Sequence, residues 1–199
     1  TVIVLLANFA IWALVNQSVS ERAWGGVING MSYSGYQAGD TDNHLSDADI
    51  DRDMNALAGQ TTTLRTYGVS DGLDRIAAIA GRHNIDVNLG AWMSPDDAKN
   101  REELARAIGV VRANPNVKRM IVGNESLLRE DITIGQLIGY IEVAKRQIDI
   151  PVTTAEPWHI WLKYPQLADS VDFITVHILP YWEGLPEDAA LGYVMYRYR

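Results

Sequence analysis

The chain contains no cysteine, which excludes disulfide bonds and thiolate metal sites. It also lacks any cluster of lysine and arginine, and its formal net charge is −8. Nucleic acids are bound through clustered basic side chains, so we expect no nucleic-acid partner. The remaining composition, 47% hydrophobic and 21% charged residues, is typical of a folded globular protein.

Several catalytic motifs are missing as well. No Gly-x-Gly-x-x-Gly follows the first predicted strand, as a dinucleotide-binding sheet would require. Ser32 and Ser34 do not lie in a Gly-x-Ser-x-Gly elbow, which argues against a serine hydrolase. The four histidines show no spacing typical of metal ligands. We therefore expect neither a metal nor a cofactor.

The longest apolar run lies at the N-terminus, where 13 of the first 15 residues are apolar. A membrane-spanning helix needs about 20 such residues, so this run is short by itself. The chain starts with Thr1, and no small-x-small cleavage site follows the run. We interpret residues 1–16 as a truncated signal-anchor helix and residues 17–24 as a linker. A cleaved signal peptide and a buried soluble helix are the alternatives.

From residue 25 to residue 199 short apolar runs alternate six times with helical patterns, about 29 residues per unit. The predicted strands are 26–34, 61–68, 85–93, 117–125, 150–157 and 171–182. The predicted helices are 46–59, 70–84, 94–114, 133–148, 159–168 and 186–199.

Strict alternation of strands and helices predicts a parallel sheet covered by helices. The strands are apolar without alternation, as expected when both faces of a sheet are buried. The unit length fits a (β/α)₈ TIM barrel of which only the first six β/α units are present. A doubly wound open sheet is the alternative, which the missing glycine-rich loop disfavours. Residues 25–199 are thus predicted to be an incomplete barrel domain.

Aromatic and polar side chains gather at the carboxyl ends of the predicted strands, where barrels build their sites. Aromatic rings can stack on the C–H face of a sugar while amides, hydroxyls and carboxylates bind its hydroxyl groups. Ordinary packing is the alternative for any single ring. The candidates are Ser32, Tyr33, Ser34, Arg65, Thr66, Tyr67, Trp92, Asn124, Glu125, Glu156, Trp158, His159, His177, Tyr181, Trp182 and Glu183.

Glu125 is the most informative of these residues. It could cap the next helix or pair with Arg129, as many glutamates do near helix starts. Its neighbour Asn124 favours chemistry, because an amide can bind a sugar hydroxyl while Glu125 protonates the leaving oxygen. Glycoside hydrolysis normally needs a second carboxylate, for which Glu156 and Glu183 are candidates. Either could instead be a hydrogen-bonding wall residue.

Five strand-end segments in order resemble glycoside hydrolase family 17, the β-1,3-glucanase family, and in particular its bacterial membrane-anchored branch linked to β-glucan synthesis. The segments are GVINGMSYS, LRTYG, VGNES, TTAEPWHIW and DFITVHILPYWEG. The resemblance covers nearly everything after residue 24.

The resemblance implies a retaining β-glucan hydrolase or transglycosylase with Glu125 as general acid/base. It implies that the substrate is bound by Asn124, Tyr33, Arg65, Tyr67, Glu156, Trp158, His177, Tyr181 and Trp182. The family's nucleophile is a glutamate at the end of strand seven, followed by Gly and Trp, and no such segment occurs here. We therefore expect a longer polypeptide, with the nucleophile beyond Arg199.

The implied partners are a β-glucan, the lipid bilayer through the N-terminal helix, and other membrane proteins. The implied location is the bacterial inner membrane, with the barrel on the periplasmic side. The alternative function is a non-catalytic glucan-binding or accessory domain of a membrane glucan synthase or another membrane complex.

Overall fold

The computed structural model describes residues 2–15, 25–35 and 45–199. Within them lies one sheet of six parallel strands, hydrogen-bonded in the chain order β1-β2-β3-β4-β5-β6. The strands are β1 (Met31–Ser32), β2 (Thr63–Arg65), β3 (Asp86–Ala91), β4 (Val117–Asn124), β5 (Val152–Pro157) and β6 (Thr175–His177).

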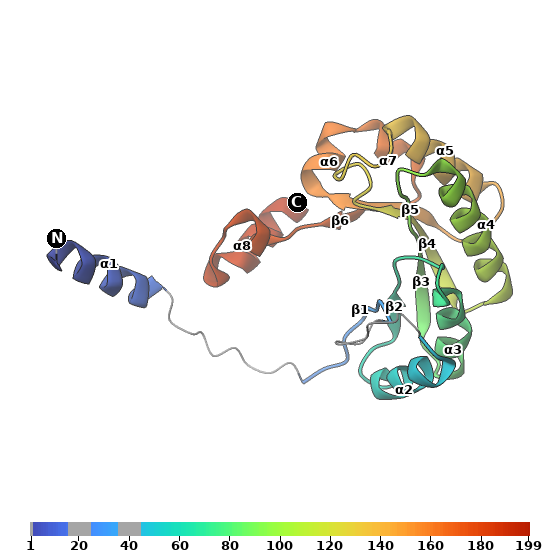
Figure 1. The fold of residues 1–199 in the computed structure, drawn as a ribbon, viewed down its shortest axis with the longest axis horizontal. Coiled ribbons are helices and arrows are strands. Elements are labelled where there is room, and N and C mark those ends of the chain that lie inside the picture. Colours follow the sequence, from blue (N-terminus) through green and yellow to red (C-terminus); the bar gives the residue numbers. More distant parts are fainter. Residues whose placement is uncertain (1, 16–24, 36–44) are drawn as a thin grey trace.

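The helices between Asp47 and Ser170 follow the strands and lie along the outer side of the curved sheet (Figure 1). The helices are α1 (Val2–Val15), α2 (Asp47–Leu57), α3 (Ile76–Arg82), α4 (Asp97–Ala113), α5 (Ile134–Lys145), α6 (Trp158–Lys163), α7 (Gln166–Ser170) and α8 (Glu187–Tyr198). The predicted α/β class, the six units and the parallel sheet are therefore confirmed, and the curled sheet is consistent with part of a TIM barrel.

The core lies between the sheet and the helices on its outer side. All six residues of β5 are buried, as predicted for a strand covered on both faces. Ile50 and Met54 bring the apolar face of α2 into the same core, and Leu137 and Ile141 do so for α5. Side chains at helix starts set the helix boundaries: Ser46 and Thr133 each form a capping box with the residue three positions later.

The first and last strands are shorter than predicted. Pairing in β1 covers only Met31–Ser32, and β6 covers only Thr175–His177, although the apolar runs are longer. Residues 180–183 instead form a 3₁₀ turn that begins with Pro180. Among the described strands, each of these two has a single neighbour in the sheet.

The fifth helical region is divided in two, contrary to the single predicted helix over 159–168. Pro165 has no backbone N–H to donate to a preceding turn, and it disfavours a helical conformation in the residue before it. Tyr164 accordingly leaves the helix with φ −127° and ψ 69°. The chain turns there, and α7 starts after the proline.

Helix α1 has 14 residues, and Ile3, Leu6 and Trp12 are among its exposed apolar side chains. Within the described ranges, none of the helices has both the length and the apolar character that crossing a bilayer demands. The predicted transmembrane helix is therefore not found. The predicted linker at 17–24 lies outside the described residues.

Gly90 allows two strand ends to come close together. A Cβ atom at this position would lie 2.4 Å from the carbonyl oxygen of Thr66 and 2.6 Å from the Cα of Tyr67. The backbone N–H of Gly90 donates a hydrogen bond to Thr66 Oγ1 at 3.1 Å. Gly90 in β3 thereby fixes the backbone that carries Tyr67.

We predict that Gly90→Ala lowers the free energy of unfolding by about 3 kcal/mol, because the new methyl group would overlap backbone atoms that have no free space. Gly109→Ala is the matched control. It lies in α4 with no atom within 4 Å of the added Cβ, and should raise stability by about 0.5–1 kcal/mol through helix propensity. Urea unfolding of both variants measures the difference, and equal effects would contradict the prediction.

Candidate active site

The end of β4 has an unusual backbone conformation. Gly123 and Glu125 have φ values of 81° and 54°, in the left-handed region that residues other than glycine rarely adopt. The N–H of Glu125 donates to the carbonyl oxygen of Ala155 at 2.7 Å, so contact with β5 continues past the last residue of β4. Such a conformation costs of order 1–3 kcal/mol and is concentrated at functional sites.

Glu125 belongs to a hydrogen-bonded group of four predicted site residues. Its Oε1 lies 2.6 Å from Nδ1 of His177, and the Nε2 of His177 lies 3.1 Å from Nη1 of Arg65. The Nη2 of Arg65 donates to Oδ1 of Asn124 at 2.6 Å. We call Arg65, Asn124, Glu125 and His177 the Glu125 group.

This group demonstrates the curvature of the sheet. β2 and β6 are four places apart in the strand order, which in a flat sheet would separate them by about 19 Å. An arginine and a histidine side chain cannot span that distance. The 3.1 Å contact between Arg65 and His177 therefore requires the sheet to curl toward a barrel.

The hydrogen bonds also assign the form of His177. A guanidinium group has only donors, so the Nε2 that faces Arg65 must be the acceptor. The proton of the neutral ring is then on Nδ1, which donates to Glu125. Only Oε1 of Glu125 is engaged in this way, and Oε2 has no hydrogen-bond partner within the described ranges. Glu125 keeps partial solvent access, with its side chain 25% exposed.

Arg65 is largely buried, and burial lowers its pKa from the usual arginine value, opposed by the charges of Tyr67 and Glu125. Its Nε is buried and has no hydrogen-bond partner among the described residues. The guanidinium carbon also lies 5.0 Å from the centre of the Tyr67 ring. The Arg65 side chain therefore connects Tyr67 to the Glu125 group.

Glu156 is placed differently from the other predicted site residues. Its side chain is completely buried, and its carboxylate accepts hydrogen bonds from the N–H groups of Leu127 and Leu128 at 2.8 and 3.3 Å. The Ser126 hydroxyl donates to it at 3.3 Å. This placement favours a role in holding the turn after β4 over the direct sugar contact predicted from the sequence.

Burial is also the largest influence on the pKa of Glu156, which is raised above 4.5. The hydrogen bonds from Leu127, Leu128 and Ser126 act in the opposite direction, and the nearby charge of Glu125 adds to the increase. A buried carboxylate loses the hydration of its charged form, which explains the direction of the shift.

Of the predicted aromatic residues, Tyr33 and Trp158 make hydrogen bonds outside the Glu125 group. Tyr33 donates its hydroxyl to Oδ2 of Asp53 in α2 at 2.9 Å, and burial raises its pKa. The Nε1 of Trp158 donates to Oε1 of Glu183 at 3.0 Å, while Arg197 lies against the Trp158 ring at 3.7 Å.

Tyr181 and Trp182 lie beyond β6 and are 82% and 78% exposed. Their rings contact each other edge to face at 5.6 Å. Neither belongs to the Glu125 group. Glu183, the other candidate for a second carboxylate, accepts hydrogen bonds from Tyr193 and Trp158, which lower its pKa.

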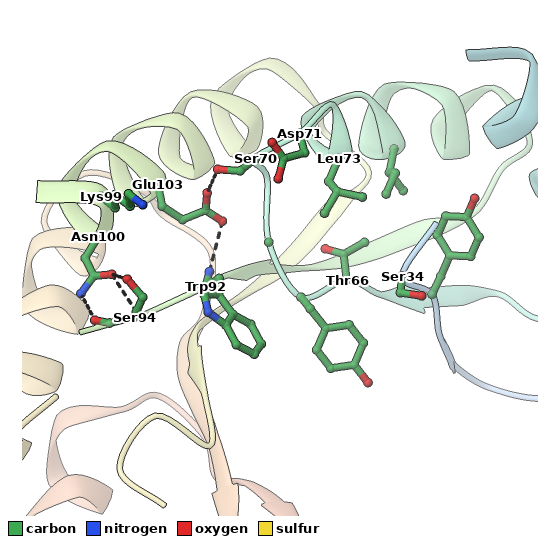
Figure 2. Close-up of a pocket in the computed structure, with 14 residues that line it drawn as sticks. Ser34, Thr66, Ser70, Asp71, Leu73, Trp92, Ser94, Lys99, Asn100 and Glu103 are labelled. Carbon is green, nitrogen blue, oxygen red and sulfur yellow. Dashed lines mark hydrogen bonds between the residues drawn. The ribbon is translucent and has the colours of Figure 1, made fainter. Parts of the chain in front are cut away.

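A pocket of about 590 Å³ lies beside the Glu125 group, at the carboxyl ends of β1, β2 and β3. Tyr33, Tyr67 and Trp92 are among the residues that line it, and Figure 2 shows Trp92 and Thr66 on the strand side. Glu125 is not among its lining residues. The residues that line the pocket include no hydrogen-bonded pair of carboxylate and imidazole like that of Glu125 and His177.

Two lining residues of this pocket, Asn100 and Glu103, were missed by the strand-end argument because they lie on α4. Both are buried, with Leu104 and Ala107 at helical spacing on the same face. Polar residues on the apolar face of a predicted helix were the available signal.

Residues 30–199 of this sequence match the protein family described as the BtgE/BtgC glycoside hydrolase domain. The chain belongs to this family. The match begins just before β1 and includes every member of the Glu125 group.

Relatives of this BtgE/BtgC-family chain share about a quarter of its residues. Glucan endo-1,3-β-glucosidase btgC of Emericella nidulans is 27% identical over 190 residues, covering 84% of this chain and 28% of the relative. Glucan 1,3-β-glucosidase of Schizosaccharomyces pombe is 28% identical over 158 residues, covering 72% and 47%. The chain thus spans less than half of the length of both relatives.

A solved structure has the same fold. It is an active-site mutant of the Rhizomucor miehei β-1,3-glucanosyltransferase in complex with laminaritriose. The TM-score is 0.74 with 26% sequence identity, over 85% of this chain and 64% of the other.

The raised pKa of Glu156 generates a prediction about stability. A folded state with the higher pKa binds the proton more tightly than the unfolded state, so this contribution to stability is complete below pH 4.5 and is lost as the pH rises through the folded pKa. Glu156→Gln does not titrate, so we expect its free energy of unfolding to fall less steeply with pH over this window.

Urea unfolding at a series of pH values measures these slopes. Glu142→Gln, at an exposed position in α5, is the control and should keep the wild-type slope. Parallel curves for wild type and Glu156→Gln would show that Glu156 does not titrate in this way.

Proposed function

We propose that the protein is a retaining β-1,3-glucan hydrolase or transglycosylase of the family-17 type, with Glu125 as its general acid/base. The observation that carries this proposal is the Glu125 group itself. A partly exposed carboxylate is held at the end of β4 by a neutral histidine, beside an amide that is fixed by arginine. The glucanase and glucanosyltransferase relatives support the substrate class.

In the first step a proton on Oε2 of Glu125 passes to the glycosidic oxygen, and the bond from that oxygen to the anomeric carbon breaks. A second carboxylate forms a bond to the anomeric carbon, giving a covalent glycosyl-enzyme. Glu125, now ionised, takes a proton from the incoming water or sugar hydroxyl, which displaces the carboxylate. Throughout, His177 holds Oε1, which leaves Oε2 for the proton transfer.

The second carboxylate is the part that the described site does not supply. Glu156 is buried against the backbone of residues 126–128, and Glu183 is engaged by Trp158 and Tyr193. We therefore propose that the nucleophile lies on a strand that follows Arg199 in the complete protein. β6 has an unpaired edge in the described sheet, where such a strand would add.

Glu125→Gln in the full-length protein should lower the rate on laminari-oligosaccharides by about 10²–10⁴-fold, because the proton donor is removed. A dinitrophenyl glucoside leaves without protonation, so its first step should be largely preserved. Glu142→Gln is the control and should retain the wild-type rate. Products longer than the substrate identify transfer, and shorter products alone identify hydrolysis.

An unchanged rate in Glu125→Gln would exclude Glu125 as the general acid. A full-length protein that binds laminari-oligosaccharides without converting them would favour the alternative, a non-catalytic glucan-binding or accessory domain.

We further propose that residues 1–16 anchor the protein in a bacterial inner membrane, with the barrel on the periplasmic side. The apolar, exposed side chains of α1 support this proposal, and a spanning helix would need more apolar residues before Thr1. The full-length protein should stay in the membrane fraction after a carbonate wash. Release into the soluble fraction would contradict the anchor.

A further inference from the structure

Glu103 in α4 is a buried carboxylate outside the Glu125 group. Its side chain is 5% exposed, and it accepts three hydrogen bonds. Oε1 accepts from the backbone N–H of Val69 at 2.7 Å and from the backbone N–H of Trp92 at 3.1 Å. Oε2 accepts from the hydroxyl of Ser70 at 2.6 Å. Figure 2 shows Glu103 between Ser70 and Trp92.

The three donors lie on two separate strand ends. Val69 and Ser70 belong to the loop after β2, and Trp92 directly follows β3. Gly68 permits the close approach, because a Cβ atom there would lie 2.9 Å from Oε1 of Glu103. A single carboxylate from a helix thus joins the backbones of two neighbouring loops.

These two loops carry the aromatic walls of the pocket, Tyr67 and Trp92. Each of these two rings also lies against an arginine that donates a hydrogen bond to Asn124. Tyr67 lies against Arg65, which binds Oδ1 of Asn124. Trp92 lies 4.4 Å from Arg129, which donates to the backbone oxygen of Asn124. A displacement of either wall relative to the other would therefore change the pocket next to the acid/base.

We propose that Glu103 is a positioning residue that fixes Tyr67 and Trp92 as the walls of a pocket for a glucosyl unit away from the cleaved bond. This inference rests on the proposed function. It assigns the pocket a ligand of the same class, because Trp92 is 40% exposed in a pocket that is also lined by the exposed polar residues Ser34 and Asp71. Glu103 touches no substrate atom in this role, and it acts through the two loops.

The role depends on the acceptor positions of Glu103. Glu103→Gln keeps Oε1 for the N–H groups of Val69 and Trp92, and its amide can donate to the Ser70 hydroxyl. We therefore expect Glu103→Gln to behave as the wild type. Glu103→Ala removes all three acceptor contacts and should release the walls.

The test measures kcat and KM of the full-length protein on laminarihexaose and on laminaritriose. Glu103→Ala should raise KM for laminarihexaose about tenfold, because the bound substrate would lose its contacts with the displaced rings of Tyr67 and Trp92. Its kcat should stay within about twofold, since the Glu125 group is untouched. KM for laminaritriose, which is too short to fill the distant pocket as well as the cleavage site, should change little.

Glu102→Ala is the matched control, because Glu102 is the adjacent residue on α4 and is exposed in an ion pair with Arg106. It should leave both constants unchanged. Circular dichroism establishes that each variant is folded. If Glu103→Ala does not fold, Ser70→Ala removes one contact at an exposed position, and a KM increase of about threefold for laminarihexaose is expected.

Three results would overturn the inference while leaving the proposed function intact. The first is an unchanged KM for laminarihexaose in Glu103→Ala, or in Ser70→Ala where that variant takes its place. The second is an equal rise in KM for both substrates. The third is a KM of Glu103→Gln for laminarihexaose that differs from the wild-type value. A wild-type protein that converts neither substrate refutes the proposed function itself.

Discussion

The guanidinium group of Arg65 is the interaction on which the candidate site depends. It comes from β2 and binds Asn124 at the end of β4 and His177 at the end of β6, and so holds three strands to one geometry. Since it can only donate, it determines which nitrogen of His177 carries the proton, and therefore that Nδ1 is the donor to Glu125. A lysine would supply the charge at this position without the fork of fixed donors.

The curled parallel sheet makes this reach possible. Parallel strands end at one edge, and the curl brings the ends of non-neighbouring strands toward a common centre. The helices outside the sheet contribute in a second way, because α4 sends Glu103 between two loops at that edge. Both the ends of the strands and the inner face of a helix therefore shape the candidate site.

The sequence predicted the order and direction of the strands, because alternating apolar runs and helical patterns permit few other architectures. The strand-end rule also identified all four members of the Glu125 group. It could not tell that Glu156 turns inward, because a position at a strand end does not fix the direction of a side chain. Glu103 was missed for a related reason: a glutamate on a helix normally faces solvent. The apolar runs of β1 and β6 extended past their pairing, so the predicted strand lengths were too long.

The left-handed conformation of Glu125 has a consequence for how this position can evolve. Glycine adopts that conformation without strain and asparagine tolerates it better than glutamate, so the glutamate at this position is not the residue that the backbone prefers. Selection for thermodynamic stability alone would move this site away from glutamate. A glutamate at this position therefore lowers the stability of the fold relative to glycine, which is the pattern expected where a residue is kept for its side chain and not for its backbone.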